Sequence, residues 1–372
     1  RRTGVPPGSP VRRRGVHLSV RALVLAGGSG SRLRPITHTN AKQLIPVANV
    51  PILFHVLRTI AEAGITEVGI VVGTGATGAE VRAAVGDGAA FGVRATYVEQ
   101  DAPLGIAHAV GAAESYLRGE PFLLFLGDNL LLEGVTRFVR QFEDTRPDAQ
   151  ILLTRVPEPE HFGVAVLEDE RVVRLVEKPK EFISDVALVG VYLFTDVIFD
   201  AIGTLAPSAR GEYEITEAIQ WCIDRGRNVR AELVGGWWKD TGRPEDLLEA
   251  NRMLLSRLAP RIEGDVDAAT TSAGVVVVEP GARVVRSTLI GPLVIGRDVV
   301  IEDARLGPDV AISAGCTVRG GAVTDSIVME GCVLHGARLR GSLLGRGVEV
   351  VGNGASVVHR LVLGDQSRVE VD

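Results

Sequence analysis

This chain of 372 residues has few cysteines, few aromatic residues and no long apolar run. Its three cysteines, Cys222, Cys316 and Cys332, form no Cys-x-x-Cys pair and no cluster with histidine, which excludes a disulfide framework and a cysteine-based zinc site. Unpaired cysteines of this kind are typical small buried residues of a protein in the reducing cytoplasm. No apolar run reaches the ~18 residues that would span a membrane. The sequence therefore predicts a cytoplasmic protein with no membrane partner.

Positive charge is also scarce. The net charge of −6 conceals an asymmetry, because residues 1–20 carry five arginines and no acid, which leaves 35 basic against 46 acidic residues in the remainder. A body this acidic is not expected to bind nucleic acid. Residues 1–19 are basic, rich in proline and without the apolar region of a signal peptide, so we expect a disordered leader there. Any functional cluster of basic side chains must therefore be local.

The most informative stretch begins with an apolar run at residues 22–26, which predicts a buried strand followed by a glycine-rich loop. Glycines let backbone N–H groups approach an anion because no Cβ stands in the way. Arginine and lysine side chains can neutralise a polyphosphate. The loop and the residues after it supply both kinds of group: Gly27, Gly28, Gly30, Arg32, Arg34 and Lys42. The sequence therefore predicts a loop that binds nucleotide phosphates.

This loop differs from the two best-known phosphate loops. A dinucleotide-binding fingerprint needs a third glycine at the position of Leu33, and a P-loop needs Gly-Lys-Ser/Thr, which is missing here. The pattern is instead Gly-Gly-x-Gly-x-Arg, with Lys42 ten residues after Arg32.

Two patterns divide the chain after the leader. From residue 20 to about 258, strand-like runs alternate with helical stretches, which predicts an α/β domain with a Rossmann-like, mixed but mainly parallel sheet. The expected strands are 22–26, 68–73, 93–98, 121–126, 150–155, 163–167, 171–176, 187–194 and 229–234. The expected helices are 50–63, 105–117, 132–144, 196–203, 214–226 and 244–258. Ligands of such domains bind beyond the carboxyl ends of the strands.

A different pattern fills residues 264–372. Short apolar steps alternate with glycine, and Val294, Val300, Leu306 and Ile312 are six residues apart. This hexapeptide spacing is typical of a β-helix, in which each step buries an inward aliphatic side chain. We therefore expect three regions: a leader at 1–19, an α/β domain at 20–258 and a β-helix at 264–372.

Two acidic residues follow apolar segments of the first domain. Asp128 follows the run 122–127, and Asp240 follows Trp238 and Lys239. One or two carboxylates, together with substrate phosphates and water, are the usual ligands of magnesium. The pair, taken with the phosphate loop, predicts a Mg²⁺ site at Asp128 and Asp240.

Eight motifs in order resemble the sugar-1-phosphate nucleotidylyltransferases, and among them the long form of glucose-1-phosphate thymidylyltransferase, which has a C-terminal left-handed β-helix. They cover residues 21 to about 256. The motifs run from Leu25–Arg32 and Lys42-Gln43 through Gln100-x-x-Pro103-x-Gly105, Leu126–Asn129, Phe162–Val164, Glu177–Pro179 and Arg210–Thr216 to Trp238–Gly242. Lys42-Gln43 and the Gln100 segment favour the thymidylyl branch.

The resemblance implies a reaction and a role for each matching residue. A sugar-1-phosphate oxygen attacks the α-phosphate of dTTP in line, and pyrophosphate leaves. The catalytic residues would be Arg32, Lys42 and Lys178, and Mg²⁺ would be bound by Asp128 and Asp240. The nucleotide would contact Leu25, Gly27, Gly28, Ser31, Arg32, Gln43, Gln100, Pro103 and Gly105. The sugar phosphate would contact Gly163, Glu177, Lys178 and Arg210.

Three alternatives remain open from the sequence. Uridylyl transfer from UTP is the closest, because uracil and thymine present the same imide edge. A bifunctional enzyme would need an acyltransferase site in the β-helix, where the only histidines are His335 and His359. A relative without catalytic activity is the third alternative, although every charged motif residue is present.

The β-helix is expected to serve assembly. A stack of coils exposes flat aliphatic faces and an open end, and such faces associate readily. We expect a homo-oligomer, with a trimer through the β-helix as one form it could take. The valines at 275–278 and the segment 348–351 are candidates for the contact.

Overall fold

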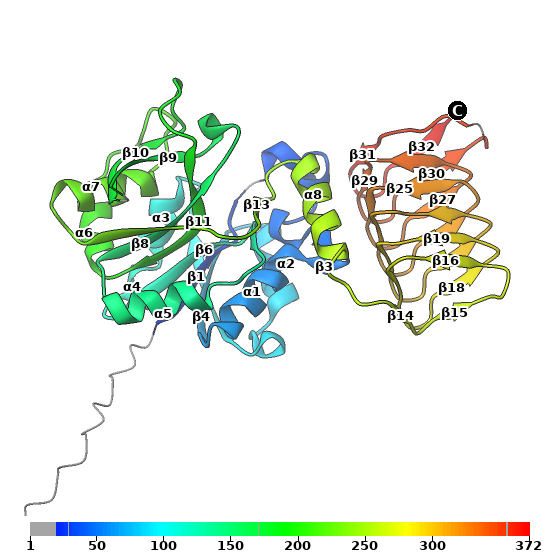
Figure 1. Ribbon diagram of the computed structural model, residues 1–372, viewed down its shortest axis with the longest axis horizontal. Coiled ribbons are helices and arrows are strands. Elements are labelled where there is room, and N and C mark those ends of the chain that lie inside the picture. The colour runs from blue at the N-terminus through cyan, green and yellow to red at the C-terminus, as the bar shows by residue number, and fades with distance from the viewer. Residues whose placement is uncertain (1–19, 29, 170, 355) are drawn as a thin grey trace, which may run out of the picture.

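The computed structural model describes residues 20–28, 30–169, 171–354 and 356–372. The expected leader at 1–19 lies outside these residues. The described chain forms an N-terminal α/β domain and a C-terminal β-helix that lie side by side (Figure 1).

The centre of the N-terminal domain is a mixed sheet of nine strands. Its parallel part has the order β6 (Phe122–Leu126), β1 (Arg21–Leu25), β4 (Glu67–Gly73) and β5 (Arg94–Gln100). Strand β11 (Val186–Phe194) pairs antiparallel with β6, β8 (Ala149–Arg155) and β9 (Gly163–Glu168). The sheet is completed by β10 (Arg171–Glu177), antiparallel to β9, and β12 (Val229–Leu233), parallel to β8.

Helices cover both faces of this sheet, as alternating side chains of its strands require. In β1, Ala22 and Val24 pack in one apolar cluster, whereas Leu23 packs in the other. The first cluster includes side chains of α1 (Ile52–Glu62), α2 (Ala76–Val85) and α5 (Thr136–Thr145). The second includes side chains of α3 (Ile106–Ala112), α4 (Glu114–Leu117), α6 (Val197–Ile202) and α7 (Ile215–Asp224).

The sequence located most of these elements, with two differences in the helices. The expected helix at 105–117 is divided into α3 and α4 at Ala113. Helix α2 was not expected, because its alanines and glycine form no apolar stripe; only Gly78, Val81 and Val85 are buried.

Short elements between the strands build the edge where the carboxyl ends of the parallel strands lie. Three 3₁₀ helices follow β1, at η1 (Ser31–Leu33), η2 (Ile36–His38) and η3 (Lys42–Leu44), and the hairpin of β2 (Pro46–Val47) and β3 (Val50–Pro51) comes next. Strand β7 (Asn129–Leu131) pairs with β13 (Trp238–Asp240). This pairing places Asp240 opposite Asn129, and therefore beside Asp128.

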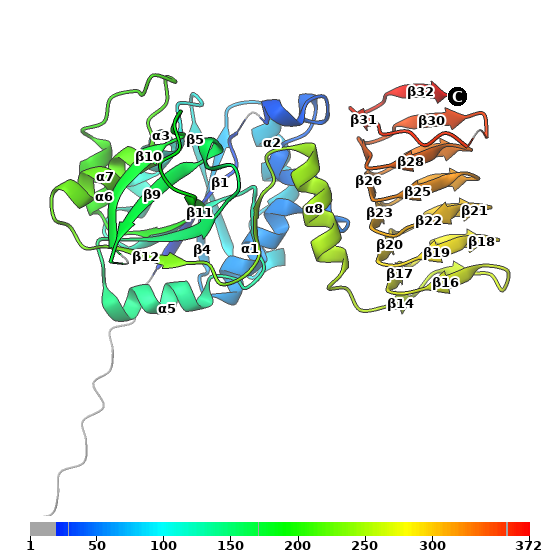
Figure 2. The ribbon, with the colours of Figure 1, turned by 45° about the horizontal axis from the view of Figure 1, so that its top comes forward.

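The C-terminal domain is a left-handed β-helix, and Figure 2 shows its coils stacked in order up to the C-terminus. One sheet contains β14 (Arg261–Ile262), β17 (Val276–Val278), β20 (Leu293–Ile295), β23 (Val310–Ile312), β26 (Ser326–Val328), β29 (Leu343–Leu344) and β31 (Val362–Leu363). The second contains β15 (Asp265–Val266), β18 (Arg283–Val285), β21 (Val300–Glu302), β24 (Thr317–Arg319), β27 (Val333–His335), β30 (Glu349–Gly352) and β32 (Arg368–Val371). The third contains β16 (Thr271–Ala273), β19 (Thr288–Ile290), β22 (Arg305–Leu306), β25 (Ala322–Thr324) and β28 (Arg338–Arg340).

The repeat of the coils is shorter than three hexapeptides. Leu293 pairs with Val310, 17 residues later, and Val310 pairs with Ser326, 16 residues later. Four residues defined the hexapeptide spacing in the sequence, and two of them, Leu306 and Ile312, belong to the apolar cluster inside the β-helix. Val294 and Val300 do not; their neighbours Ile295 and Ile301 are the inward side chains.

The first sheet of the β-helix packs against the N-terminal domain through helix α8 (Pro244–Leu255) and the β2–β3 hairpin. Val277, Val294 and Ala311 share an apolar cluster with Ala48 and Leu255. A second shared cluster joins Ile327, Met329 and Leu343 of the β-helix to Leu33, Ile36, Ile45, Val47, Ile52, Leu130, Leu247, Leu248 and Ala250. The expected contact between subunits at 275–278 is therefore not free, because Val277 is already covered within the chain.

Candidate active site

A cavity of about 390 Å³ opens at the carboxyl ends of the parallel strands. Most of the residues expected to bind substrate line it: Leu25, Gly27, Gly28, Arg32, Gln43, Gln100, Pro103, Gly105, Asp128, Gly163, Glu177, Lys178 and Asp240. Three expected residues lie behind or beside this lining, namely Ser31, Lys42 and Arg210. The cavity therefore brings together segments from residue 25 to residue 240.

The glycine loop lies at one end of the cavity, against the segment that carries Gln100. A Cβ at Gly27 would lie 3.3 Å from Gln100 Oε1 and 3.4 Å from the backbone nitrogen of Gly73, so a side chain would fill this cradle. Arg32 is exposed, and its guanidinium lies against Gly242, where a Cβ would be 3.3 Å from it. Ser31 is exposed at the start of η1.

A cluster of three charges, with Lys42 buried and two carboxylates partly buried, lies close to the loop. The Lys42 ammonium donates a hydrogen bond to Asp128 Oδ2 and is 3.9 Å from Asp240 Oδ1. Burial would lower the pKa of Lys42, but the charges of Asp128 and Asp240 outweigh it and raise the pKa. Burial acts to raise the pKa of Asp128, but the adjacent Lys42 charge holds it below its ordinary value. Lys42 is therefore a charged group whose place is set by the two carboxylates.

Asp240 differs from Asp128 in its surroundings. Its burial and the nearby Asp128 charge raise the pKa of Asp240 to about 6. Its Oδ1 atom is buried and accepts no hydrogen bond. Two close carboxylates, one with an unpartnered oxygen, are a donor set that fits a divalent cation. The described residues form no group of three or more histidine, cysteine or acidic side chains around a metal position, so further ligands would come from substrate and water.

Gln100 presents an oriented amide near the glycine loop. Its Nε2 donates to the Gly105 carbonyl at 3.4 Å and lies 3.0 Å from His108 Nδ1. A carbonyl can only accept, so this contact fixes which end of the amide is nitrogen. Gln100 Oε1 therefore faces Gly27 and the cavity. Gly105 has φ +101°, and a Cβ there would lie 2.6 Å from the Tyr213 carbonyl, so the turn requires glycine.

Another part of the cavity lining holds a more open charge cluster. Glu177 Oε1 is 3.7 Å from Lys178 Nζ and 3.5 Å from Arg210 Nη2, and Thr216 donates to Glu177 Oε2 at 3.2 Å. Burial, helped by the Glu214 charge, raises the pKa of Glu177 despite these cations. Arg210 donates its shortest hydrogen bond to Glu214, at 2.8 Å. It does not line the cavity itself and is linked to the lining by its ion pair with Glu177.

Several lining residues were not identified from the sequence. Asn129 donates to Asp128 Oδ1 at 3.0 Å, and its own Oδ1 accepts from Trp238 Nε1 at 2.7 Å. Tyr192, which also lines the cavity, was missed, and so was His108, which lies outside the lining and contacts Gln100. Asn129 follows Asp128 directly, and this adjacency could have identified it. The hydrogen bond of His108 to Gln100 depends on the turn at Gly105, which the spacing does not reveal.

The comparisons with known proteins agree with this geometry. Residues 21–257 match the family model described as nucleotidyl transferase. The chain belongs to the nucleotidyl transferase family. The match covers the whole N-terminal domain, including every element that lines the cavity.

Relatives of this family member extend the likeness into the β-helix. A glucose-1-phosphate thymidylyltransferase of Streptomyces antibioticus is 51% identical over 95% of this chain and 99% of its own length. One of Streptomyces griseus is 49% identical over the same shares. A structure from Bacillus anthracis, assigned as a glucose-1-phosphate thymidylyltransferase and solved with sucrose, is 37% identical. It covers 63% of this chain and 94% of its own, with a TM-score of 0.60.

The expected fold class and enzyme class are thereby confirmed. The chain is a nucleotidyltransferase with a mixed sheet followed by a left-handed β-helix. Among the helices of the described ranges, none is long and apolar enough to cross a membrane.

Proposed function

We propose that this enzyme transfers a thymidylyl group from dTTP to glucose 1-phosphate, which gives dTDP-glucose and pyrophosphate. One observation carries the proposal: a single cavity is lined both by the glycine loop with Arg32 and by the Glu177–Lys178 pair. The Lys42–Asp128–Asp240 cluster borders the space between them. Two Streptomyces relatives that match nearly the whole chain carry the name of this activity.

The nucleotide is bound with its base at Gln100. The Oε1 atom of Gln100 accepts the imide N–H of thymine, and the glycine loop surrounds the phosphates with backbone N–H groups. Uracil offers the same imide and lacks one methyl group, a difference of only ~1–3 kcal/mol. UTP is therefore the second substrate to consider.

Charge neutralisation and positioning account for the reaction. Arg32 contacts the β- and γ-phosphates, and Lys42 stabilises the charge on the α-phosphate as pyrophosphate departs. Lys178 holds the phosphate of the sugar, and the Glu177 carboxylate accepts hydrogen bonds from sugar hydroxyls while Arg210 orients it. The role of Gly163 is to leave room, because a Cβ there would be 3.0 Å from Glu177 Oε2.

Asp128 and Asp240 would hold Mg²⁺, which supplies Lewis-acid stabilisation of the phosphate oxygens when bound. The Lys42 ammonium also neutralises part of the negative charge of the two carboxylates. Its position next to them keeps it beside the α-phosphate.

Parallel assays of pyrophosphate release with glucose 1-phosphate and dTTP, UTP, ATP or GTP test the substrate. We expect the highest kcat/KM with dTTP and a lower value with UTP, by about 10- to 200-fold. A preference for ATP or GTP would refute the proposal. Lys178→Ala should raise KM for glucose 1-phosphate, and Arg32→Ala should raise KM for dTTP; exchanged effects would refute the assignment of the two ends.

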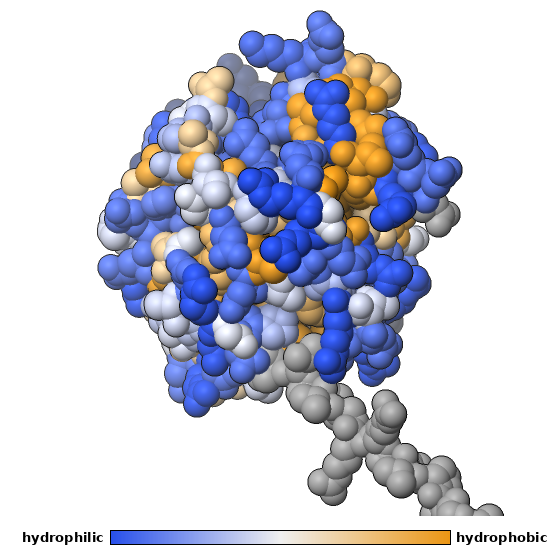
Figure 3. All heavy atoms as spheres, turned by 90° about the vertical axis from the view of Figure 1, so that its left-hand side faces the viewer, coloured by the Kyte–Doolittle hydropathy of each residue, from blue (hydrophilic) through white to orange (hydrophobic). Residues whose placement is uncertain are grey.

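The enzyme is also proposed to be a cytoplasmic homo-oligomer. The N-terminal domain covers the first sheet of the β-helix from Val277 to Leu343, so contacts between copies must use other surfaces, among them the uncovered start of that sheet at Ile262. The exposed large apolar side chains in the described ranges are Leu104, Phe182, Leu233, Ile262, Val357 and Val358. The face of the N-terminal domain away from the β-helix is mostly hydrophilic, with its largest apolar patch at the upper right and smaller apolar areas elsewhere (Figure 3). Light scattering measures the oligomeric state.

A further inference from the structure

The segment that leads to Lys42 is bonded to the last coils of the β-helix. Asp365 follows β31, and its carboxylate accepts hydrogen bonds from Thr39 Oγ1 at 2.9 Å and from Asn40 Nδ2 at 2.9 and 3.0 Å. The same carboxylate accepts the backbone N–H of Arg346 at 2.8 Å, which fixes it within the β-helix. Two residues of the phosphate-binding region are thus held by one side chain of the other domain.

Neighbouring contacts hold the same segment. The backbone N–H of Ala41 donates to Glu80 Oε2 at 2.7 Å, and Glu80 Oε1 accepts from Arg346 Nη1 at 2.8 Å. The backbone at Gly364 lies against Pro35, since a Cβ there would be 3.0 Å from the Pro35 carbonyl oxygen. Thr39, Asn40 and Ala41 therefore each carry a bond that fixes the chain immediately before Lys42.

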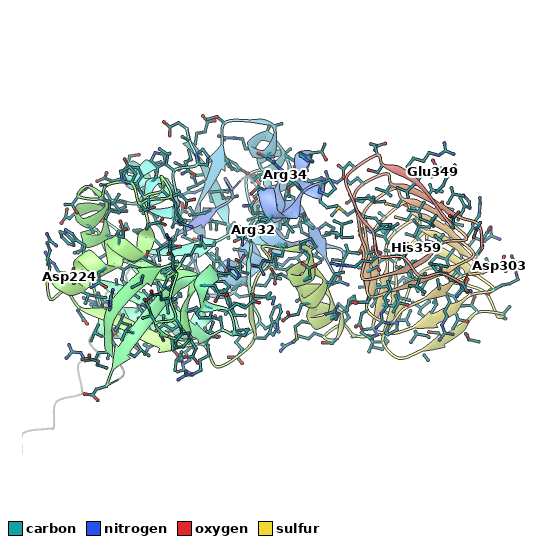
Figure 4. The ribbon with its side chains drawn as sticks, turned by 90° about the horizontal axis from the view of Figure 1, so that it is seen from above. Arg32, Arg34, Asp224, Asp303, Glu349 and His359 are labelled. Carbon is teal, nitrogen blue, oxygen red and sulfur yellow. The ribbon has the colours of Figure 1, made fainter. Side chains whose placement is uncertain are left out.

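Local structure alone supplies little rigidity here. Residues 31–44 form three short 3₁₀ helices, which have few hydrogen bonds of their own. Asn40 is 2% exposed, and its amide also donates to the Ile36 carbonyl at 3.0 Å. Figure 4 shows Arg34 of this region on the side of the N-terminal domain that faces the β-helix, with Arg32 deeper in that domain. Asp303 and Glu349 lie along the outer side of the β-helix.

We propose that Asp365 is a positioning residue of the active site, which acts through Thr39 and Asn40 to fix the segment 35–42 and hence the place of Lys42. This inference rests on the proposed function, because that function places Lys42 at the α-phosphate. It gives the β-helix a part in the reaction although none of its described residues lines the cavity.

Asp365→Ala in the full chain tests the inference. The variant removes the acceptor of Thr39 and Asn40, and we expect kcat/KM for dTTP to fall by about 10- to 100-fold, as small misplacements of reacting groups do. KM for glucose 1-phosphate should stay unchanged, because the hydrogen bonds of Asp365 go to Thr39, Asn40 and Arg346 and not to Glu177 or Lys178. Asp365→Asn, which keeps one acceptor oxygen, should restore part of the lost rate.

Arg252→Ala is the matched control. It removes another ion pair across the same interface, in which Arg252 Nε and Nη2 donate to Asp325 at 2.6 and 2.8 Å, away from residues 35–42. Hydrogen exchange of unliganded protein should increase at residues 37–44 in Asp365→Ala and not in Arg252→Ala. Equal loss of rate in both variants, or unchanged rate and exchange in Asp365→Ala, would overturn the inference. A wild-type chain inactive with dTTP would instead refute the proposed function, and the exchange result would still decide this inference.

Discussion

The two domains bury different kinds of polar residue. The N-terminal domain buries charges and amides, among them Lys42, Gln43, Gln100, Asn129 and Glu214. In the β-helix, the buried polar side chains of the described residues are serines alone: Ser287, Ser313, Ser326 and Ser342. Burying a charge or an amide costs free energy unless it is paired, whereas a hydroxyl is satisfied easily. Of these groups, Gln43, Gln100 and Asn129 line the cavity of the proposed active site, and Lys42 lies beside it.

The serines illustrate the second case. The Ser326 hydroxyl donates to the Thr324 carbonyl at 2.7 Å and accepts the backbone N–H of Ser342, in the next coil, at 3.0 Å. Ser287 bonds in the same way to Val285 and Ala304. These two hydroxyls link successive coils, and each is paired both as a donor and as an acceptor. The β-helix is therefore a suitable rigid support for the segment that Asp365 holds.

The largest effect should come from the two carboxylates beside Lys42. Asp128→Asn and Asp240→Asn remove a charge next to the reacting phosphates, which should cost several kcal/mol of transition-state stabilisation, or about a 10³-fold loss of kcat. Asp128→Asn should also lower the thermal unfolding temperature, because it removes the carboxylate that pairs with the Lys42 ammonium; Asp240→Asn, whose carboxylate makes no hydrogen bond to Lys42, should change it less. Asp303→Asn, on the outer side of the β-helix, is the control and should keep full activity. Normal turnover of either site variant at saturating Mg²⁺ would show that its carboxylate is not a ligand.

Leu343→Ala should have the next largest effect. Leu343 is completely buried in the cluster shared by both domains, so its truncation should cost about 2–5 kcal/mol of unfolding free energy. All three tryptophans, Trp221, Trp237 and Trp238, belong to the N-terminal domain, and their fluorescence reports its unfolding in urea. Leu344→Ala removes a neighbour that points into the β-helix interior and serves as the control. An unchanged fluorescence midpoint for Leu343→Ala would show that the domains are not coupled.

His55 should make the stability depend on pH. Burial, aided by the Arg58 charge, lowers the pKa of His55 to about 4, so the folded chain keeps it neutral. The unfolded chain takes up the proton near pH 6.5, so the free energy of unfolding should fall as pH drops from about 6.5 to 4, by up to about 3 kcal/mol. Urea unfolding at several pH values should show a smaller slope for His55→Gln. His335→Gln, in the β-helix, should leave the slope as it is.

The smallest effect is expected on the surface of the β-helix. Arg319 Nε donates to Glu302 Oε2 at 3.1 Å, and both side chains are exposed to solvent in part. Arg319→Ala should cost less than about 1 kcal/mol, with a smaller cost at high salt. Chemical unfolding at two salt concentrations measures it. A loss as large as that of Leu343→Ala would contradict the contrast between interior and surface.

The sequence predicted those parts of the molecule that depend on short stretches of chain. The strand before Gly27, the Gly27–Arg32 loop and the carboxylates at strand ends were each placed correctly, and the cavity contains Asp128 and Asp240 together. Ligand roles at these residues stay predictions.

Features that depend on packing between distant segments could not be predicted. Val294 and Ile295 are both buried, one against the N-terminal domain and one in the β-helix, so hydrophobicity alone does not give the inward residue. The contact of Asn40 with Asp365 joins residues 325 positions apart. Nothing in either local sequence marks this pair, because asparagine and aspartate are common in turns.

The number of coils in the β-helix determines whether Asp365 can reach Asn40. The first sheet contacts the N-terminal domain in successive coils from Val277 to Val362, and Asp365 lies just beyond the last of these contacts. Each coil adds about 4.8 Å along the stack. Insertion or deletion of one coil between these contacts would carry Asp365 that far from Asn40, beyond hydrogen-bond distance. The length of the coil stack must therefore match the distance from the interdomain contact to the segment before Lys42, and a change in the number of coils would alter the proposed active site.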